Sequence, residues 1–313
     1  MADPVLKWAG GKRQLLEEIY ARFPSEFAEY HEPFLGGGAV FFDMEPRGGT
    51  VNDTNPRLVN CYRVIRDRPE ELADRLAAFD DPESDPDPEL AFAAEDWKDR
   101  SVDQYFYQQR ARFNRRAYAD ETWPDDERSR IEEAALLVYL NRTCYNGLYR
   151  ENSDGGFNVP IGRYADPDWV QADRIREASD ALARTEIRNE DFEYVLDAAA
   201  EGDLVYVDPP YEPMSATADF AEYSAEGFDR DDQERLLRVA SELDERGVNV
   251  VLSNSGVTFE RYREAGFDVT REGATRSINS DETARGEVDE IIATNVPEEE
   301  RSESPGQASI ADF

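Results

Sequence analysis

The fold of this chain is decided by one stretch of sequence, Leu204-Val205-Tyr206-Val207-Asp208-Pro209-Pro210-Tyr211. Its first four residues form an apolar run that is typical of a strand buried on both faces of a parallel sheet. Two prolines then end the strand, because each fixes φ and lacks a backbone donor. We therefore expect a carboxylate, a bare carbonyl and an aromatic ring at the carboxyl edge of an open α/β sheet, where such folds bind ligands.

These three groups suit one chemical task. The carboxylate of Asp208 and the carbonyl of Pro209 can accept hydrogen bonds from an amino group conjugated to a ring, while Tyr211 stacks on that ring. The exocyclic nitrogen of adenine is a poor nucleophile, since its lone pair is delocalised, and such bonds would favour a tetrahedral nitrogen. We interpret the segment as a site for methylating that amino group. A strand that merely ends in a Pro-Pro turn is the alternative.

Length and composition indicate a globular chain without a membrane partner. The 313 residues, 40% of them hydrophobic, can bury a substantial core in two structural units. No apolar run reaches membrane-spanning length, and the N-terminal residues lack the features of a signal peptide. With two cysteines, Cys61 and Cys144, and one histidine, His31, we expect neither disulfides nor a metal site. We expect a cytoplasmic monomer.

The charge of the chain is extreme, with 70 acidic and 35 basic residues and a net charge of −35. Such a balance normally argues against a nucleic-acid partner. However, three of the 35 basic residues are lysines, which leaves 32 arginines. We interpret acidic excess with few lysines as halophilic adaptation to multimolar salt, where the Debye length is about 3 Å and net charge loses its long-range effect.

Two of the three lysines lie in the glycine-rich segment Leu6–Lys12, ahead of an amphipathic helix expected over residues 13–22. A glycine-rich loop before a helix offers free N–H groups to an anion such as a carboxylate or phosphate. The spacing is not that of a Walker loop. Lys7 and Lys12 are therefore candidates for function, with an accidental surface pair as the alternative.

A second glycine-rich segment, Glu32–Gly38, leads into apolar residues and predicts a strand, glycine turn and helix of the nucleotide-binding kind. The next strand, expected near residues 50–52, ends at Asp53, whose carboxylate suits a ribose diol. Asp53 would otherwise cap the helix expected over residues 55–66. In this order the elements favour a cofactor that contains adenosine.

The same blocks occur in a known family. The chain resembles the Dam-type DNA adenine-N6 methyltransferases through six ordered segments: Lys7–Lys12, Pro33–Gly38, Asn52–Asn55, Leu140–Tyr164, Asp208–Tyr211 and Met214–Tyr223. Within the last segment, residues 215–220 are similar to the subgroup that methylates GATC. The resemblance implies methyl transfer from S-adenosyl-L-methionine to N6 of an adenine flipped out of double-stranded DNA, as in restriction-modification systems.

The resemblance also implies site residues. Those for the cofactor are Trp8, Ala9, Gly10, Lys12, Phe34, Gly36, Gly38, Asp53, Asp191, Phe192 and Asp208. Asp191 and Phe192 would take the adenine of the cofactor, although a helix cap and a core side chain are the alternatives. Those for DNA are Lys7, Tyr145, Asn146, Leu148, Arg150 and Pro160.

The expected fold is α/β, a doubly wound, mostly parallel, seven-stranded methyltransferase sheet with an inserted, mainly helical target-recognition domain. Residues 1–66 and 185–296 form the catalytic domain, with strands near 50–52, 187–189, 204–207, 248–253 and 288–294. Residues 67–184 form the insert, with helices expected over 101–119 and 129–139. Its predicted core residues are Phe106, Phe113, Leu136, Leu137 and Leu140.

Residues 141–164 differ from the rest of the insert, because glycine, asparagine, arginine and tyrosine are frequent and Gly155-Gly156 predicts a hairpin turn. Such a hairpin can enter the major groove and wedge between base pairs. By resemblance, Tyr145 inserts into the base stack, and Arg150 and Lys7 each read a guanine. Leu148 and Pro160 would meet a thymine methyl group, and Asn146 the DNA backbone or the orphaned base. The departure from the family around residues 143–144 leaves the exact recognition sequence open.

Two other classes of function remain open. A methyltransferase for RNA or protein glutamine uses a similar turn, but it gives no reason for the hairpin of residues 141–164. A DNA-binding module that has lost its cofactor would not need Lys12, Asp53 and Asp208.

The C-terminal segment, residues 297–313, is acidic and polar, and we expect it to be disordered. It ends with Gln307, Ile310 and Phe313 at the spacing of a peptide that binds the sliding clamp of replication. There, one helical turn would place Ile310 and Phe313 in an apolar pocket. A frayed terminus with accidental apolar residues is the alternative.

Overall fold

A seven-stranded sheet forms the centre of the protein in a computed structural model, which describes residues 2–80, 102–118, 126–211, 228–275, 287–302 and 309–310. The strands are β2 Tyr30–Glu32, β3 Gly49–Asn52, β4 Glu186–Arg188, β5 Leu204–Val207, β6 Asn249–Ser255, β7 Asp268–Thr275 and β8 Glu287–Thr294. Their order is β4-β3-β2-β5-β6-β8-β7. The pairs from β4 to β6 are parallel, and β8 runs antiparallel to both of its neighbours. The predicted mostly parallel sheet is confirmed.

The chain changes its direction of travel across the sheet between β2 and β5. After β2 it moves outward through β3 and β4, and after β5 it moves the other way through β6. Open α/β sheets bind ligands at such a switch point, outside the carboxyl ends of the strands. The segments that leave β2 and β5 begin at Pro33 and Asp208, so the topology brings the two predicted motifs together.

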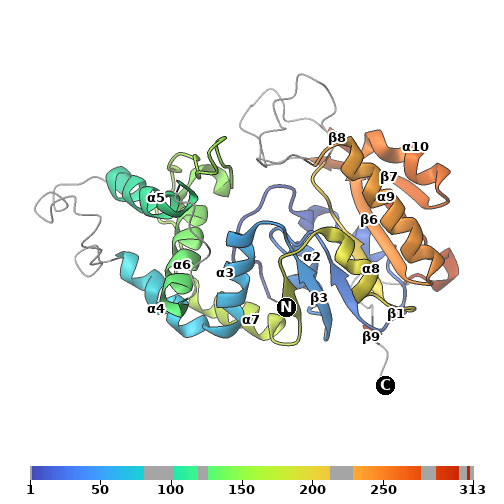
Figure 1. Ribbon diagram of the computed structural model, residues 1–313, viewed down its shortest axis with the longest axis horizontal. Coiled ribbons are helices and arrows are strands. Elements are labelled where there is room, and N and C mark those ends of the chain that lie inside the picture. The colour runs from blue at the N-terminus through green and yellow to red at the C-terminus, as the bar shows by residue number, and fades with distance from the viewer. Residues whose placement is uncertain are drawn as a thin grey trace, which may run out of the picture.

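Helices flank the sheet and make up most of the described part of the insert (Figure 1). They are α1 Leu16–Tyr20, α2 Ala39–Met44, α3 Pro56–Asp67, α4 Pro69–Ala77, α5 Val102–Tyr118, α6 Glu127–Thr143, α7 Ala172–Leu182, α8 Val195–Ala198, α9 Arg230–Glu245 and α10 Phe259–Glu264. Short 3₁₀ turns cover Lys12–Gln14, Ala78–Asp80, Tyr145–Gly147, Phe192–Tyr194, Gly256–Thr258 and Glu298–Glu300. Within the described residues, no helix has the length and apolar character needed to cross a membrane.

The central strand β5 is buried on both faces, as its apolar sequence predicts. Leu204 and Tyr206 belong to one core, and Val205 and Val207 to a second, because successive side chains of a strand point to opposite faces. The first core continues without a break into the insert. It includes all the predicted core residues there, which are Phe106, Phe113, Leu136, Leu137 and Leu140.

Helix α3 joins the insert to the sheet. The guanidinium of Arg57 lies 3.4 Å from the carboxylate of Glu133 on α6 and 3.9 Å from the centre of the Phe113 ring. Close by, Asn60 Nδ2 donates to the carbonyl of Arg130 at 3.0 Å. A buried ion pair and a buried amide need such partners, since an unpaired polar group in the core is costly. The insert is therefore held against the sheet by specific polar contacts as well as by apolar packing.

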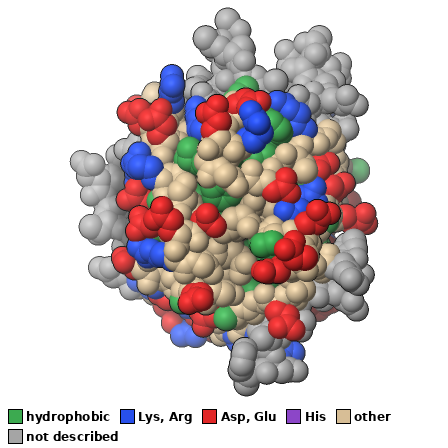
Figure 2. All heavy atoms as spheres, turned by 90° about the vertical axis from the view of Figure 1, so that its right-hand side faces the viewer, with side chains coloured by type: hydrophobic (Ala, Val, Ile, Leu, Met, Phe, Trp, Pro, Cys, Tyr) green, Lys and Arg blue, Asp and Glu red, His purple; other side chains and the backbone are tan. Residues whose placement is uncertain are grey.

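On the face that carries α9 and α10, acidic side chains are spread out rather than gathered in one patch, and basic side chains lie among them (Figure 2). Many of the arginines pair with acidic side chains, either within one helix, as Arg263 with Glu260 at 2.5 Å, or between helices, as Arg176 with Glu70 at 2.7 Å. Exposed pairs of this kind contribute at most about 1 kcal/mol each. They offset little of the repulsion from a net charge of −35.

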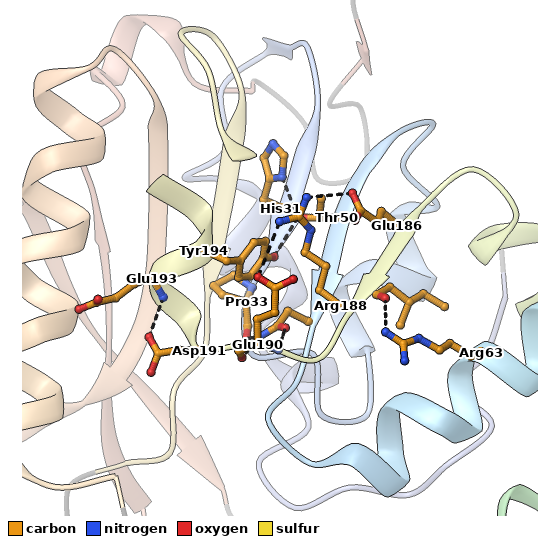
Figure 3. Close-up of polar contacts among 12 residues, drawn as sticks. His31, Pro33, Thr50, Arg63, Glu186, Arg188, Glu190, Asp191, Glu193 and Tyr194 are labelled. Carbon is orange, nitrogen blue, oxygen red and sulfur yellow. Dashed lines mark hydrogen bonds and ion pairs between the residues drawn. The ribbon is translucent and has the colours of Figure 1, made fainter. Parts of the chain in front are cut away.

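A chain of buried polar side chains links the parallel strands (Figure 3). His31 Nδ1 lies 2.9 Å from Thr50 Oγ1, which in turn lies 2.8 Å from the hydroxyl of Tyr194. On its other side, His31 Nε2 lies 3.2 Å from the carboxylate of Asp203. Both ring nitrogens of the single histidine are thus engaged inside the fold, which assigns it a structural role.

Three elements differ from the sequence prediction. The helix expected over residues 13–22 is shorter, being a 3₁₀ turn followed by α1. Helix α6 extends to Thr143, so the hairpin begins at Cys144 and not at Asn141. Strand β7 was not predicted, because its sequence is mostly polar and contains a glycine. It forms at the edge of the sheet, where pairing with β8 compensates for weak propensity.

The start of the tail is ordered, which corrects our prediction of disorder for residues 297–302. The guanidinium of Arg301 donates to the carbonyl of Val296 at 2.9 Å and pairs with Asp268 at 2.7 Å. The backbone N–H of Ser302 donates to the carbonyl of Phe23 at 3.0 Å. An acidic composition predicts disorder only when nothing offers a partner, and here Arg301 binds Asp268, the first residue of β7.

Beyond this point the structure describes one short strand, β9 Ser309–Ile310, which pairs in parallel with β1 Glu26–Phe27. The predicted clamp-binding residues Gln307 and Phe313 lie outside the described residues, as does the segment of residues 214–223.

Candidate active site and DNA interface

The Asp208–Tyr211 segment lies at the carboxyl end of β5, next to the N-terminal lysine loop. Lys12 Nζ is 2.9 Å from Asp208 Oδ1 and also donates to the carbonyl of Gly10 at 2.9 Å. The side chain of Lys12 is 4% exposed and that of Asp208 is 21% exposed. A buried ammonium requires such partners, because an uncompensated charge is costly to remove from water. The structure therefore brings together two motifs that are almost 200 residues apart in sequence.

A glutamate that the sequence analysis missed completes this cluster. Glu290 on β8 is 6% exposed, and its Oε2 accepts a hydrogen bond from the hydroxyl of Tyr211 at 3.1 Å. The same oxygen lies 3.9 Å from Lys12 Nζ, which is 4.8 Å from the centre of the Tyr211 ring. In the sequence, the only sign that Glu290 belongs to the site was its position as an acidic residue directly before the apolar residues 291–292. The face of the sheet on which the Glu290 side chain lies depends on how β8 pairs with its neighbouring strands, which its own sequence does not determine.

The electrostatics of the cluster favour a positively charged ligand. Burial raises the pKa of Asp208 above its ordinary value, the Lys12 ammonium opposes this rise, and the charge of Glu290 adds to it. Close by, burial raises the pKa of Glu32 well above its usual range, although a hydrogen bond of 2.7 Å from Tyr30 partly offsets the cost. The ammonium of Lys12 lies 2.9 Å from Asp208 and 3.9 Å from Glu290, so one positive charge is shared between two carboxyl groups.

The glycine turn after β2 packs tightly against Trp8. A Cβ at Gly36 would lie 2.9 Å from Trp8 Cδ1, and one at Gly37 would lie 2.8 Å from Trp8 Cβ. At Gly38, the cap of α2, φ is +68° and a Cβ would lie 2.7 Å from the Phe42 ring. The predicted glycine turn is therefore present, and the indole of Trp8 forms one wall of it.

Asp53 lies beside this turn at the end of β3. Its Oδ2 accepts from the N–H of Gly36 at 3.0 Å, and its Oδ1 accepts from the N–H of Asn55 at 2.8 Å. Asn55, not Asp53, caps α3, because its side chain accepts from Arg57 N at 3.0 Å and from Leu58 N at 3.3 Å. The alternative role for Asp53 as the helix cap is wrong.

Asp191 and Phe192 occupy the positions that their alternative interpretations predicted. Asp191 caps the following turn by accepting from Glu193 N at 3.0 Å (Figure 3), and it pairs with Arg235 at 2.9 Å. Phe192 is buried and stacks on Phe34, with ring centres 5.4 Å apart. The two predicted cofactor residues Phe34 and Phe192 are thus in contact, whereas the carboxylate of Asp191 is already engaged.

The hairpin is a loop with two antiparallel bridges, Cys144 with Ile161 and Glu151 with Phe157. Its turn is closed by bonds from Asn152 N to the Gly156 carbonyl at 2.8 Å and from Gly155 N to the Asn152 carbonyl at 2.9 Å. A turn is therefore present as predicted, but its corner lies at residues 153–154, directly before Gly155-Gly156.

The predicted DNA-binding residues fall into two groups. Tyr145 is 38% exposed, and Pro160, whose carbonyl accepts from Tyr145 N, is also exposed. Arg150 is held by a 2.6 Å bond from its Nε to Asn158 Oδ1. By contrast, Leu148 is buried in the core.

Lys7 and Asn146 flank the exposed side of the hairpin. Lys7 Nζ lies 4.4 Å from the centre of the Tyr164 ring, and burial, together with the charge of Arg142, lowers the pKa of Lys7. Asn146 adopts a left-handed conformation with φ of 55°, which positions it at the apex of the 3₁₀ turn.

Comparison with known proteins gives a consistent result. The family described as D12 class N6 adenine-specific DNA methyltransferase matches residues 8–278. A Type II methyltransferase of Lactococcus lactis subsp. cremoris is 37% identical over 294 residues, which are 93% of this chain and 95% of that protein. A Type II methyltransferase of Methanocaldococcus jannaschii is 35% identical over 88% of this chain and 92% of its own length. The DNA adenine methylase of Escherichia coli K12 is 32% identical over 93% and 95%, respectively. The family match over residues 8–278 and this extent of identity show that the chain belongs to the D12 class of N6 adenine-specific DNA methyltransferases.

Proposed function

We propose that this DNA methyltransferase uses S-adenosyl-L-methionine to methylate N6 of an adenine that is flipped out of duplex DNA, within the sequence GATC. The observation that carries the proposal is the cluster of Lys12, Asp208, Tyr211 and Glu290 at the switch point of the sheet. Two carboxylates around one ammonium leave negative charge unbalanced, which suits a positively charged ligand.

The residues around the cluster fit such a cofactor. Gly10 has φ of +80°, and a Cβ there would meet no atom within 4 Å, so the loop has open space on its outer side. Trp8 and the glycine turn would hold the amino-acid part, and Asp53 would hold the ribose. Phe34 and Phe192 would contact the adenine. S-adenosyl-L-methionine, when bound, would supply a methyl group on a positively charged sulfur.

The protein would activate the target base by positioning it. Asp208 and the carbonyl of Pro209 would accept hydrogen bonds from the two N–H groups of N6, while Tyr211 stacks on the base. The hydroxyl of Tyr211 donates to Glu290, which fixes the plane of its ring. Because burial raises the pKa of Asp208, its carboxylate would also accept a proton from the nitrogen once the methyl group is attached.

Sequence recognition would come from the hairpin and the lysine loop. Tyr145 is exposed and can insert between base pairs, and Arg150 and Lys7 can each donate to a guanine in the major groove. Asn146 would contact the DNA backbone or the orphaned base. Leu148, being buried, would support Pro160 at a thymine methyl group more than contact it directly.

The C-terminal residues Gln307, Ile310 and Phe313 would form a peptide for the sliding clamp, and the enzyme would act as a monomer. A tether of this kind would raise its local concentration on newly made DNA.

Base-modification sequencing tests the proposed chemistry and specificity together. DNA that lacks methylation would be incubated with the purified enzyme and S-adenosyl-L-methionine in molar salt, and every modified position would be mapped. We expect N6-methyladenine at GATC. Methylation of adenine at another sequence would overturn the specificity alone. Methyl transfer only to RNA or to protein glutamine would overturn the substrate.

A further inference from the structure

One buried amide connects the cofactor loop to the DNA hairpin. Asn141, near the end of α6, is 1% exposed, and its Oδ1 accepts from the N–H of Lys7 at 2.8 Å. Its Nδ2 donates to the carbonyl of Lys7 at 2.7 Å and to the carbonyl of Gly147 at 3.0 Å. Both amide protons and the amide oxygen are therefore used, and they contact the backbone of two separate segments.

The two segments also touch directly on either side of this amide. A Cβ at Gly147, where φ is +66°, would lie 2.5 Å from Lys7 Cβ, so the backbones approach as closely as a glycine allows. Trp8 stacks on Tyr149 with ring centres 5.2 Å apart and an interplanar angle of 22°. The ammonium of Lys7 lies over the ring of Tyr164. The lysine loop and the hairpin thus form one continuous contact.

The same loop reaches the cofactor side of the site. The indole of Trp8 lies against the glycine turn at Gly36 and Gly37, and Lys12 pairs with Asp208. Within six residues the chain therefore contacts the hairpin, the glycine turn and the catalytic segment. A shift of the hairpin relative to α6 would move Lys7 and would be transmitted along this loop to Lys12.

We propose that Asn141 is a positioning residue that couples binding of the cofactor to binding of the recognition sequence. This inference rests on the proposed function of the site. Asn141 fixes the backbone of Lys7 relative to Gly147, so either ligand, by ordering its own side of the contact, orders the other side as well.

The chemistry of the contact explains why an asparagine is needed. Leucine has nearly the same shape, but it would leave the N–H and the carbonyl of Lys7 without their partner in a largely buried position. Aspartate would still accept from Lys7 N, but it would place a negative charge against the carbonyls of Lys7 and Gly147. Both substitutions should therefore loosen the contact.

A second asparagine provides a matched control. Asn114 on α5 makes the same two bonds to the backbone of Phe157, with its Nδ2 donating to the carbonyl and its Oδ1 accepting from the N–H, each at 2.8 Å. It holds the far arm of the hairpin, and these two bonds go to Phe157 and not to the lysine loop. Asn60, which bonds the carbonyl of Arg130, is a second control for loss of a buried amide between helices.

The experiment measures coupling directly. The dissociation constant of S-adenosyl-L-homocysteine is determined by calorimetry with and without a GATC duplex, and that of the duplex with and without S-adenosyl-L-homocysteine. For the wild type we expect each ligand to tighten the other by about tenfold, within the usual range of such couplings. In Asn141→Leu both ratios should fall to about one, and they must fall together because coupling is reciprocal. Asn114→Leu should weaken duplex binding but keep the wild-type ratio between the dissociation constants measured without and with the other ligand. Asn60→Leu should leave that ratio unchanged.

The possible outcomes separate this inference from the proposed function. If the wild type binds neither S-adenosyl-L-homocysteine nor the GATC duplex, the proposed function fails. If it binds both, but the ratio is one or Asn141→Leu keeps the wild-type ratio, the coupling role is overturned and the proposed function stands. Should Asn141→Leu lack native circular dichroism, Asn141→Asp decides, with Gly147→Ala as an independent disruption of the same contact.

Discussion

At the scale of single residues, the pairing of Lys12 with Asp208 determines what the site can do. The pair is largely enclosed, and the carboxylate has a raised pKa although an ammonium lies 2.9 Å away. Burial therefore outweighs the neighbouring cation in setting that pKa. A carboxylate in this state is a strong hydrogen-bond acceptor, and in the proposed mechanism it would take up the proton that the methylated nitrogen releases.

Removal of this carboxylate should abolish catalysis. In Asp208→Ala we expect the single-turnover rate of methylation to fall by about 10³-fold or more, since a contact made in the transition state is lost. The matched control is Glu260→Ala on α10, which removes an exposed acid that pairs with Arg263. Circular dichroism checks that both variants fold. Near-normal turnover of Asp208→Ala would contradict the proposed role.

Glu290 should act mainly on cofactor affinity. Glu290→Gln keeps an oxygen that can accept from Tyr211 but removes a negative charge 3.9 Å from Lys12. We expect about tenfold weaker binding of S-adenosyl-L-methionine, because the site becomes less favourable for a cation. A smaller change is expected for S-adenosyl-L-homocysteine, which is uncharged at sulfur. Equal losses for the two ligands would show that Glu290 supports packing only.

Arg150 should determine discrimination at one base pair. Arg150→Ala is expected to weaken rejection of sites that differ from GATC at a guanine by about 1–3 kcal/mol. Asn158→Ala removes only the 2.6 Å partner of the guanidinium and should have a smaller effect in the same direction. Methylation rates on GATC and near-cognate duplexes give both values. Unchanged discrimination in Arg150→Ala would assign the arginine to phosphate or structural contacts.

At the scale of elements, the sequence predicted β5, β6 and β8 from their apolar runs, whereas the short strands β3 and β4 were predicted from their places next to Asp53 and Asp191. It did not predict β7, whose polar residues are explained by its place at the edge. Asn141 was assigned to the hairpin, since Asn-Arg-Thr is a weak helical sequence, yet it lies in α6 and two of its three side-chain bonds go to Lys7, 134 residues away. Local propensity contains no information about such distant partners.

The strand β9 includes Ile310, a residue of the proposed clamp-binding peptide. Ile310 pairs with Phe27 of β1, so binding to a clamp must replace this pairing. We expect the full-length enzyme to bind the purified clamp at high salt, and Ile310→Ala and Phe313→Ala to bind at least tenfold more weakly, about 1.4 kcal/mol. Surface plasmon resonance on the immobilised clamp measures this. Equal binding of all three proteins would show that the tail is not the contact.

At the scale of the whole molecule, the net charge of −35 sets the conditions for folding. Unscreened acidic side chains repel one another, and exposed ion pairs offset little of this. We expect native circular dichroism and methylation activity at salt concentrations of about 1 M and above, where the Debye length is about 3 Å, and their loss in dilute buffer. An enzyme that is fully active in dilute buffer would refute the halophilic interpretation.

The scarcity of lysine has a practical consequence for anyone who handles the protein. The side-chain amines of the chain are those of Lys7, Lys12 and Lys98. Lys12 is enclosed beside Asp208, whereas Lys7 is partly accessible above Tyr164. Amine-directed reagents, including common cross-linkers, fluorescent esters and activated biosensor surfaces, would at Lys7 attach beside the hairpin that we propose reads DNA. Coupling through an introduced cysteine on α10 would leave that hairpin free.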